Sequence, residues 1–217
     1  MKGDNQVINL AWLNIIMSDT RIPTQKRSIE KRNKIVEKGF ELMCENGYYK
    51  TTTSDIAKYI GISTGIIYQY FNDKKEIFIE GVQHYSEGIL FPMIKILDEN
   101  TISLENIDDI IESIINDLIK QHTFSKKAHE ELMAMSHLDS DISEIFKKSE
   151  LELTKKIVTV LEDNNINLAN AQEKIHIAIG LIDNLCHETV YHQHEQFNYD
   201  VMKTETIKLI VYILKSK

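Results

Sequence analysis

"SDIAKYIGISTGIIYQYFNDKKEIF", residues 54–78, places two short apolar patterns on either side of Gly61. The first pattern has the spacing of a helix that begins after Thr52, whose hydroxyl can accept from the free backbone amides there. Gly61 ends that helix, because glycine tolerates the left-handed backbone found at helix ends. Ser63 caps a second helix, which the pattern predicts over residues 64–71. Helices this short are not stable alone, so the segment needs support from its neighbours.

Two short helices joined by a glycine-containing turn form a helix-turn-helix, whose second helix can lie in the major groove of DNA. The residue types suit that role. Gly65 has no side chain, so the backbone can approach DNA closely, and Tyr68 can donate to a phosphate one turn later. Lys74, at the start of the next helix, is placed to clamp a phosphate. Thr53 and Ser54, which open the first helix of the pair, can contact the other side of the groove.

The run "TTTSDIAKYIGISTGIIYQYFNDKKEIF", residues 51–78, resembles the N-terminal signature of the TetR family of bacterial transcriptional regulators. The similarity extends over about residues 26–78. It implies a homodimer whose two N-terminal domains bind double-stranded DNA at a palindromic operator, and a C-terminal helical domain that holds a small ligand. The matched positions are the threonine before the second helix, Asp55-Ile56-Ala57, Gly61-Ile62-Ser63, Gly65, Tyr68, Tyr70-Phe71 and Lys74, with Phe40 and Gly47 in the first helix.

The resemblance also implies which residues contact DNA. Ile66 and Gln69 occupy positions at which the family varies, and they offer an apolar surface for a thymine methyl and an amide for adenine. The second helix has no arginine, which disfavours a guanine-rich operator. The other contacts carried over are Thr53, Ser54, Thr64, Gly65, Tyr68 and Lys74.

Outside this segment the chain also reads as helical. It has only two prolines and eight glycines, and strand-like alternation is absent from the sequence. The prediction is an all-α fold of nine or ten helices, with a helix-turn-helix domain at residues 26–73 and a ligand-binding and dimerisation domain at residues 74–217. Residues 1–25 form an extension of uncertain order. Helices are expected over residues 26–47, from 74 toward Pro92, where the helix kinks or ends, and over 107–122, 126–137, 142–161, 169–194 and 201–215.

The composition limits the classes of protein that fit. Two cysteines give no disulfide framework, which favours a reduced, cytoplasmic setting, and the apolar runs are shorter than the roughly 18 residues of a membrane span. Residues 1–76 carry 12 Lys/Arg against 9 Asp/Glu, whereas the remainder carries 13 against 24. Local basic excess on a chain of net charge -8 indicates an anionic partner at one end.

A second cluster is "CHETVYHQHEQ", residues 186–196, in which His187, Tyr191 and His194 share one face of the expected helix. Such histidines can ligate a divalent metal, but the spacing is not that of a zinc hydrolase, and the sequence predicts no metal, cofactor or enzyme. The scarcity of arginine favours an apolar or cationic ligand. The candidate ligand contacts are Phe124, Met133, Met135, Tyr191 and His192.

The last two expected helices, over residues 169–194 and 201–215, carry apolar stripes that a monomer core would also produce. The family resemblance favours a dimeric four-helix bundle made from them in two copies. The sequence thus predicts a repressor that releases its operator when a small molecule binds. The alternatives are an activator of the same fold, or a metal-responsive helical protein that uses the 187–194 histidines.

Overall fold

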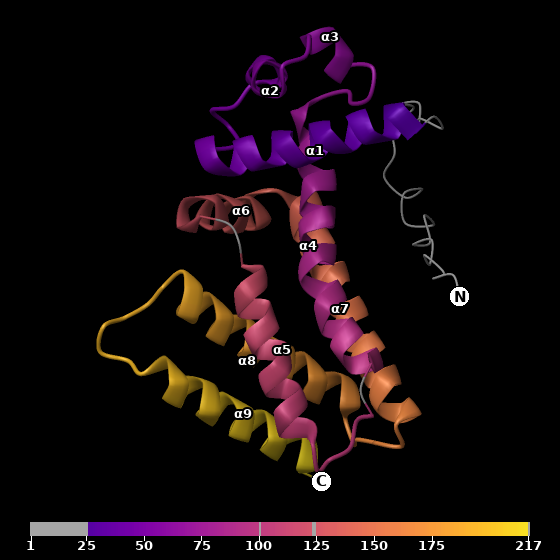
Figure 1. Cartoon of the computed structure of the whole chain (residues 1–217), viewed down its shortest axis with the longest axis vertical. Coiled ribbons are helices and arrows are strands. Elements are labelled where there is room, and N and C mark those ends of the chain that lie inside the picture. Colours follow the sequence, from indigo (N-terminus) through magenta and orange to yellow (C-terminus); the bar gives the residue numbers. More distant parts are fainter. Residues whose placement is uncertain (1–25, 100, 123–124, 217) are drawn as a thin grey trace.

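The computed structural model describes residues 26–99, 101–122 and 125–216, and its secondary structure there is entirely helical (Figure 1). The all-α prediction is confirmed. The expected extension over residues 1–25 lies outside the described residues. The helices are α1 (Lys26–Asn46), α2 (Thr53–Ile60), α3 (Thr64–Ile67), α4 (Lys74–Glu99), α5 (Ile107–Gln121), α6 (Lys126–Leu138), α7 (Ser140–Asp163), α8 (Ala171–Val190) and α9 (Tyr199–Lys215).

The first three helices form one end of the molecule, where α2 and α3 lie on the outer side of α1 (Figure 1). Thr52 begins α2 with a reciprocal cap: its hydroxyl accepts from the Asp55 amide, and the Asp55 carboxylate accepts from the Thr52 amide. Gly61 ends α2 with φ 79°, a left-handed conformation that favours glycine. The predicted start and stop of this helix are therefore confirmed.

The second helix of the pair is shorter than its sequence pattern predicts. α3 ends at Ile67, and the Gln69 and Tyr70 amides then bond to carbonyls only three residues back. This tighter winding is typical of the last turn of a helix. It brings Phe71 into the core, where its side chain is 1% exposed.

α4 runs from the N-terminal end toward the opposite end of the molecule, and it continues through position 92 rather than ending there (Figure 1). A proline removes one helical hydrogen bond and tends to bend or break the helix. α4 packs against α1, α5 and α7. The sequence predicted that the helix bends or ends at Pro92, and it does not end there.

Among the described residues, the core consists of two hydrophobic clusters. One is formed mainly by α5, α7, α8 and α9, around residues such as Ile115, Leu185 and Ile210. The other joins α1 to α4 with α6 and the start of α7, so that Phe40, Phe78 and Leu132 belong to the same cluster. α6 therefore packs with the N-terminal helices although it is distant from them in the sequence. The expected domain boundary after residue 73 stays a prediction.

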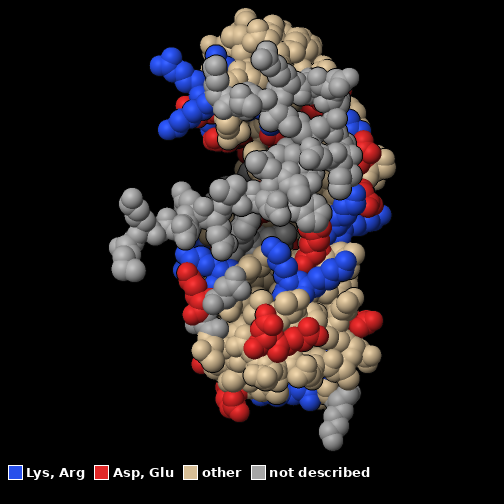
Figure 2. Space-filling model, turned by 90° about the vertical axis from the view of Figure 1, so that its right-hand side faces the viewer, with Lys and Arg blue, Asp and Glu red and all other residues tan. Residues whose placement is uncertain are grey.

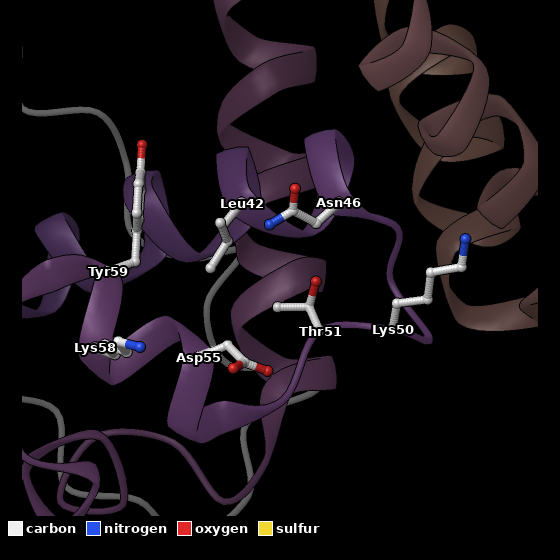
Figure 3. Close-up of a pocket in the computed structure, with 7 residues that line it drawn as sticks. All are labelled: Leu42, Asn46, Lys50, Thr51, Asp55, Lys58 and Tyr59. Atoms are coloured by element: carbon white, nitrogen blue, oxygen red, sulfur yellow. The ribbon is translucent and has the colours of Figure 1, made fainter.

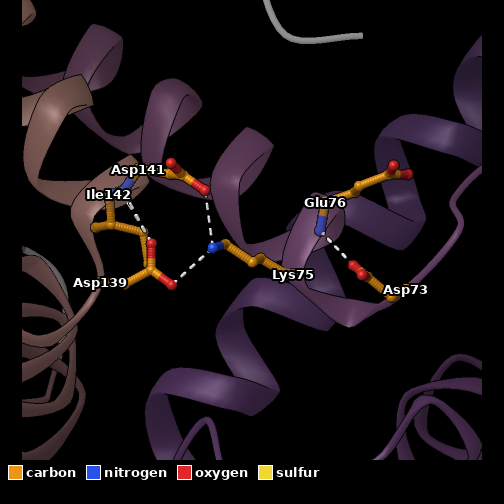
Figure 4. Close-up of polar contacts among 6 residues, drawn as sticks. All are labelled: Asp73, Lys75, Glu76, Asp139, Asp141 and Ile142. Carbon is orange, nitrogen blue, oxygen red and sulfur yellow. Dashed lines mark hydrogen bonds and ion pairs between the residues drawn. The ribbon is translucent and has the colours of Figure 1, made fainter. Parts of the chain in front are cut away.

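Ionic contacts join the start of α4 to the α6–α7 connection (Figure 4). The Lys75 ammonium lies 2.8 Å from both the Asp139 and the Asp141 carboxylates. Asp139 also caps α7 by accepting from the Asp141 and Ile142 amides. On the neighbouring turn, Asp73 accepts from the Glu76 amide and caps α4. Lys75, which lies only a few positions after the helix-turn-helix, thus ties the start of α4 to the α6–α7 connection.

Candidate functional site

The α2–turn–α3 segment presents its polar residues outward and its apolar residues inward. Ile56 and Ile67 are fully buried and anchor the two helices in the core cluster that they share with α1 and α4. The hydroxyls of Ser54 and Thr64 lie 3.4 Å apart, so the starts of α2 and α3 meet at the surface. Of the predicted DNA contacts, Ser54, Gly65, Tyr68 and Gln69 are exposed, and Thr53, Thr64 and Ile66 are half-buried.

Gly65 is not required by the packing of the protein itself. A Cβ atom added there would meet only the Ser63 hydroxyl oxygen, 4.0 Å away. Its backbone also lacks the positive φ that forces glycine at Gly61. The absence of a side chain at position 65 therefore leaves room for something outside the chain to approach the start of α3.

Lys74 stands at the start of α4, as the sequence predicts, and its side chain is already engaged within the protein. Its ammonium donates to the backbone carbonyls of Tyr48 (2.6 Å) and Thr51 (2.7 Å) and lies 4.5 Å from the centre of the Tyr48 ring. Burial lowers the pKa of this ammonium. Its observed role is to hold the loop that precedes α2. Contact with a DNA phosphate stays a prediction, and it would have to share the ammonium with these carbonyls.

The electrostatic character of this end is mixed. On the face drawn in Figure 2, the outer tip is uncharged, and basic side chains project at its edge. Beside α2 lies an open groove of about 620 Å³, whose lining includes Lys50 and Lys58 (Figure 3). Both lysines are exposed, so they can add positive charge next to the uncharged helix-turn-helix surface.

The histidine cluster differs from the one expected along a single helix. α8 ends at Val190, so His194 lies in the following loop, where it is exposed and its imidazole is 3.8 Å from the Glu188 carboxylate. The predicted shared face of His187, Tyr191 and His194 is therefore wrong. His187 and Tyr191 instead gather with His122, at the end of α5, and His129 of α6.

The ring distances define this group, called the imidazole cluster below: His122, His129, His187 and Tyr191. The His129 ring stacks on Tyr191 at 4.1 Å between centroids and lies 4.5 Å from His187, and His122 lies 5.3 Å from His187. The sequence interpretation missed His122 and His129 as members. Nothing in the local pattern could have identified them, because they come from different helices.

The other ligand candidates are scattered. Met135 is 1% exposed and, like the half-buried Met133, packs with the N-terminal helices. His192 is half-buried, 6.3 Å from the His129 ring, and Phe124 lies outside the described residues. Within residues 26–99, 101–122 and 125–216, no three His, Cys, Asp or Glu side chains are arranged to hold a metal ion. The same part of the chain has no helix long and apolar enough to cross a membrane.

Comparisons with known proteins agree with this geometry. Residues 35–80 match the sequence profile of bacterial regulatory proteins of the tetR family. The HTH-type transcriptional regulator HbdR of Aromatoleum sp. (strain CIB) is 48% identical over 48 residues, which are 22% of this chain and 21% of that protein. The fatty acid metabolism regulator protein of Bacillus subtilis (strain 168) is 28% identical over 144 residues, 63% of each chain. The alignments thus span less than two-thirds of either relative.

The fold has a solved counterpart. A crystal structure from Mesorhizobium loti MAFF303099, assigned to the TetR family of transcriptional regulators, superposes with a TM-score of 0.69. It is 14% identical in sequence, and the superposition covers 88% of this chain and 98% of that one. At this identity the likeness concerns the fold, and it extends the similarity well beyond the matched N-terminal segment.

Proposed function

We propose that this member of the TetR family of bacterial regulatory proteins is a transcriptional repressor, which binds a palindromic operator as a homodimer and releases it when a small molecule binds. The observation that carries the proposal is the outward surface of α2 and α3. Thr64, Gly65, Tyr68 and Gln69 form an uncharged, accessible surface that the core does not need. An uncharged surface flanked by lysines suits DNA binding, because the uncharged side chains can contact base edges while the lysines contact phosphates on either side.

Individual roles follow from side-chain chemistry. Gln69, exposed just after α3, offers the amide that pairs with adenine, and the half-buried Ile66 offers an apolar contact for a thymine methyl. The hydroxyls of Thr53, Ser54, Thr64 and Tyr68 donate to phosphates and set the register of the protein on DNA. These contacts would read A·T pairs in preference to G·C pairs.

Dimerisation is proposed through α8 and α9. Both helices leave large apolar side chains in solvent: Ile177 is 52% exposed, Leu209 47% and Tyr212 72%. On α9, Val201, Leu209 and Tyr212 recur at helical spacing, so they lie on one side of that helix. A two-fold dimer that covers this side would present two copies of α3 about 34 Å apart, one turn of DNA.

α6 is the proposed connection between the ligand and the DNA-binding end. One of its residues, His129, belongs to the imidazole cluster. Its residue Glu131 and its N-cap Ser125 contact the N-terminal part of the chain: the Glu131 carboxylate accepts from the Tyr48 amide at 2.6 Å, and Ser125 donates to Glu45 at 2.6 Å. A ligand that favours one position of α6 would therefore shift the loop before α2. The ligand would change the affinity for DNA only as far as the ligand itself binds the two positions of α6 with different affinity.

The test begins with selection of bound sequences from a random DNA library by the purified chain. We expect an inverted repeat with half-sites about one helical turn apart. Gln69→Ala should relax the preference at one base pair per half-site by about 1–3 kcal/mol. The control is Gln193→Ala, which removes an exposed amide far from α3 and should leave selection unchanged. Recovery of no sequence by folded, dimeric protein would contradict the proposal.

A further inference from the structure

The imidazole cluster joins three helices at the centre of the proposed signalling route. His122 follows α5, His129 belongs to α6, and His187 and Tyr191 lie at the end of α8, which reaches beneath α6 in Figure 1. His129 and Tyr191 are 2% and 4% exposed, whereas the His187 side chain is 22% exposed. The cluster is therefore buried at one side and open to solvent at the other.

The hydrogen-bonding state of the rings follows from their partners. The His122 Nδ1 lies 2.6 Å from the Leu118 carbonyl, which can only accept, so Nδ1 carries the proton and Nε2 has a free lone pair. That Nε2, the His129 Nδ1 and the Tyr191 hydroxyl are all buried without a hydrogen-bond partner among the described residues. Buried polar atoms are nearly always paired, so three unpaired ones on adjacent rings indicate a missing partner.

Burial disfavours the charged forms of three members of the cluster. Burial, together with a smaller effect of the neighbouring histidines, lowers the pKa of His129 to about 4. Burial also lowers the pKa of His187, against the opposing effect of Asp183, and raises the pKa of Tyr191. The other titratable groups that face the cluster are His192 and, on α4, Tyr85. The missing partner thus meets the Nε2 lone pair of His122, the Nδ1 atom of His129 and the hydroxyl of Tyr191.

A metal ion does not fit these atoms. No three His, Cys, Asp or Glu side chains of the described residues are arranged to hold one, and the cluster's own rings include no such group. An ammonium group would satisfy the imidazoles but would leave the phenolic proton without an acceptor. A carboxylic acid satisfies both kinds of group, since its hydroxyl donates and its carbonyl oxygen accepts. An alcohol has a single oxygen atom, which would have to donate to an imidazole and accept from the phenolic hydroxyl at the same time.

We propose that the imidazole cluster is the polar end of the ligand site and that it binds the carboxyl group of a small organic acid together with one proton. The inference rests on the proposed function, because it names the class of the proposed small molecule. The acid arrives as a carboxylate, and one proton is taken from solvent and shared between a carboxyl oxygen and an imidazole nitrogen. This replaces the apolar or cationic ligand that the scarcity of arginine favoured.

The first experiment measures binding to the purified full chain without DNA. Benzoate and octanoate are titrated by calorimetry in two non-carboxylate buffers of different ionisation enthalpy, with benzyl alcohol and benzylamine as matched probes. We expect at least one acid to bind with uptake of about one proton, so that its affinity falls as the pH rises. His129→Phe and Tyr191→Phe, which keep the stacked rings, should each weaken binding about tenfold or more.

His137→Phe is the control, because His137 is exposed on the same helix and lies outside the cluster. Three results would overturn the inference: neither acid binds, the alcohol or amine binds as tightly as benzoate, or both ring variants bind the acids like the unchanged chain.

Operator release is measured separately by fluorescence anisotropy. An acid that binds the cluster but leaves operator affinity unchanged would refute the proposed function and keep the site. A compound of another class that releases the operator equally from the unchanged chain and from His129→Phe would keep the function and refute the site.

Discussion

Single side chains in this protein divide into those that the fold needs and those that it does not. Ile67 and Phe71 are buried and hold α3 in place, whereas Tyr68, between them, is 55% exposed. Such alternation within one short segment means that the outward residues can change without loss of stability. The functional contribution of each outward residue is therefore measurable by substitution.

Tyr68→Phe should weaken operator binding by about 1 kcal/mol, because it removes one hydroxyl that donates to a phosphate. The salt dependence of binding should stay the same, since no charge is lost. The measurement is fluorescence anisotropy with the selected operator. Tyr49→Phe serves as the control: Tyr49 is 71% exposed and lies outside α2 and α3. Equal operator affinity of the two variants would show that the Tyr68 hydroxyl does not contact DNA.

His129 should make the free energy of unfolding depend on pH. Its pKa is about 4 in the folded chain and near the ordinary value of 6.5 after unfolding, so the unfolded chain binds more protons between these values. Stability is therefore fully present above about pH 6.5 and is lost toward pH 4, by up to about 3 kcal/mol. Urea denaturation between about pH 4 and 6.5 should show that the free energy of unfolding depends less on pH in His129→Phe than in the unchanged chain. An identical profile would mean that His129 is not the group responsible.

At the scale of helices, α4 is the element on which the rest is assembled. It contacts α1, α5 and α7, and its first turn is bound to the α6–α7 connection through Lys75. Its crossing with α1 is close because Gly81 faces Phe40. This crossing sets the position of the helix-turn-helix relative to the body.

Gly81→Ala should destabilise the protein by about 1–3 kcal/mol, since its Cβ would lie 2.3 Å from Phe40 Cγ and the two helices would have to separate. Gly88→Ala is the matched change on the same helix, where a Cβ meets nothing within 4 Å. That variant should gain about 0.5–1 kcal/mol from helix propensity. Thermal or urea unfolding distinguishes the two. Equal stability of both variants would show that the α1–α4 crossing adjusts freely.

At the scale of the molecule, the two ends differ in what they expose. The N-terminal end presents short polar side chains together with Tyr49, Tyr59 and Tyr68, whereas α8 and α9 present the aliphatic residues Ile177 and Leu209, and Tyr212. Exposed apolar groups on neighbouring helices are typical of an interface. The molecule is thus divided into an end that suits nucleic acid and a side that suits a second copy.

Leu209→Glu should convert the proposed dimer into a monomer, because it would place a charge in the apolar centre of the interface. Analytical ultracentrifugation measures the change. Leu151→Glu on α7 is the control, since Leu151 has a similar exposure, 48% against 47%, outside the proposed interface. As Leu209→Glu loses the dimer, its affinity for the operator should also fall. If the Leu209→Glu protein stays dimeric, the dimer interface lies on another surface of the molecule.

Much of the architecture could be predicted from local patterns. The caps of α2 at Thr52 and Gly61, the all-helical content and the helix-turn-helix depend on interactions within a few residues, which spacing and residue type report directly. The predicted ends of α3 and α8 were wrong. Both depend on how the last turn packs: Phe71 is drawn into the core, and Tyr191 turns onto His129.

By itself, the sequence of this protein determined which segments are helical, where the two short helices turn, and which side chains at that turn are small and polar. Only the tertiary structure decided that Lys74 holds two loop carbonyls and that His122 and His129 meet His187 and Tyr191. The reason is physical: capping and helical periodicity act between neighbours in the chain, whereas these contacts join helices that packing alone brings together.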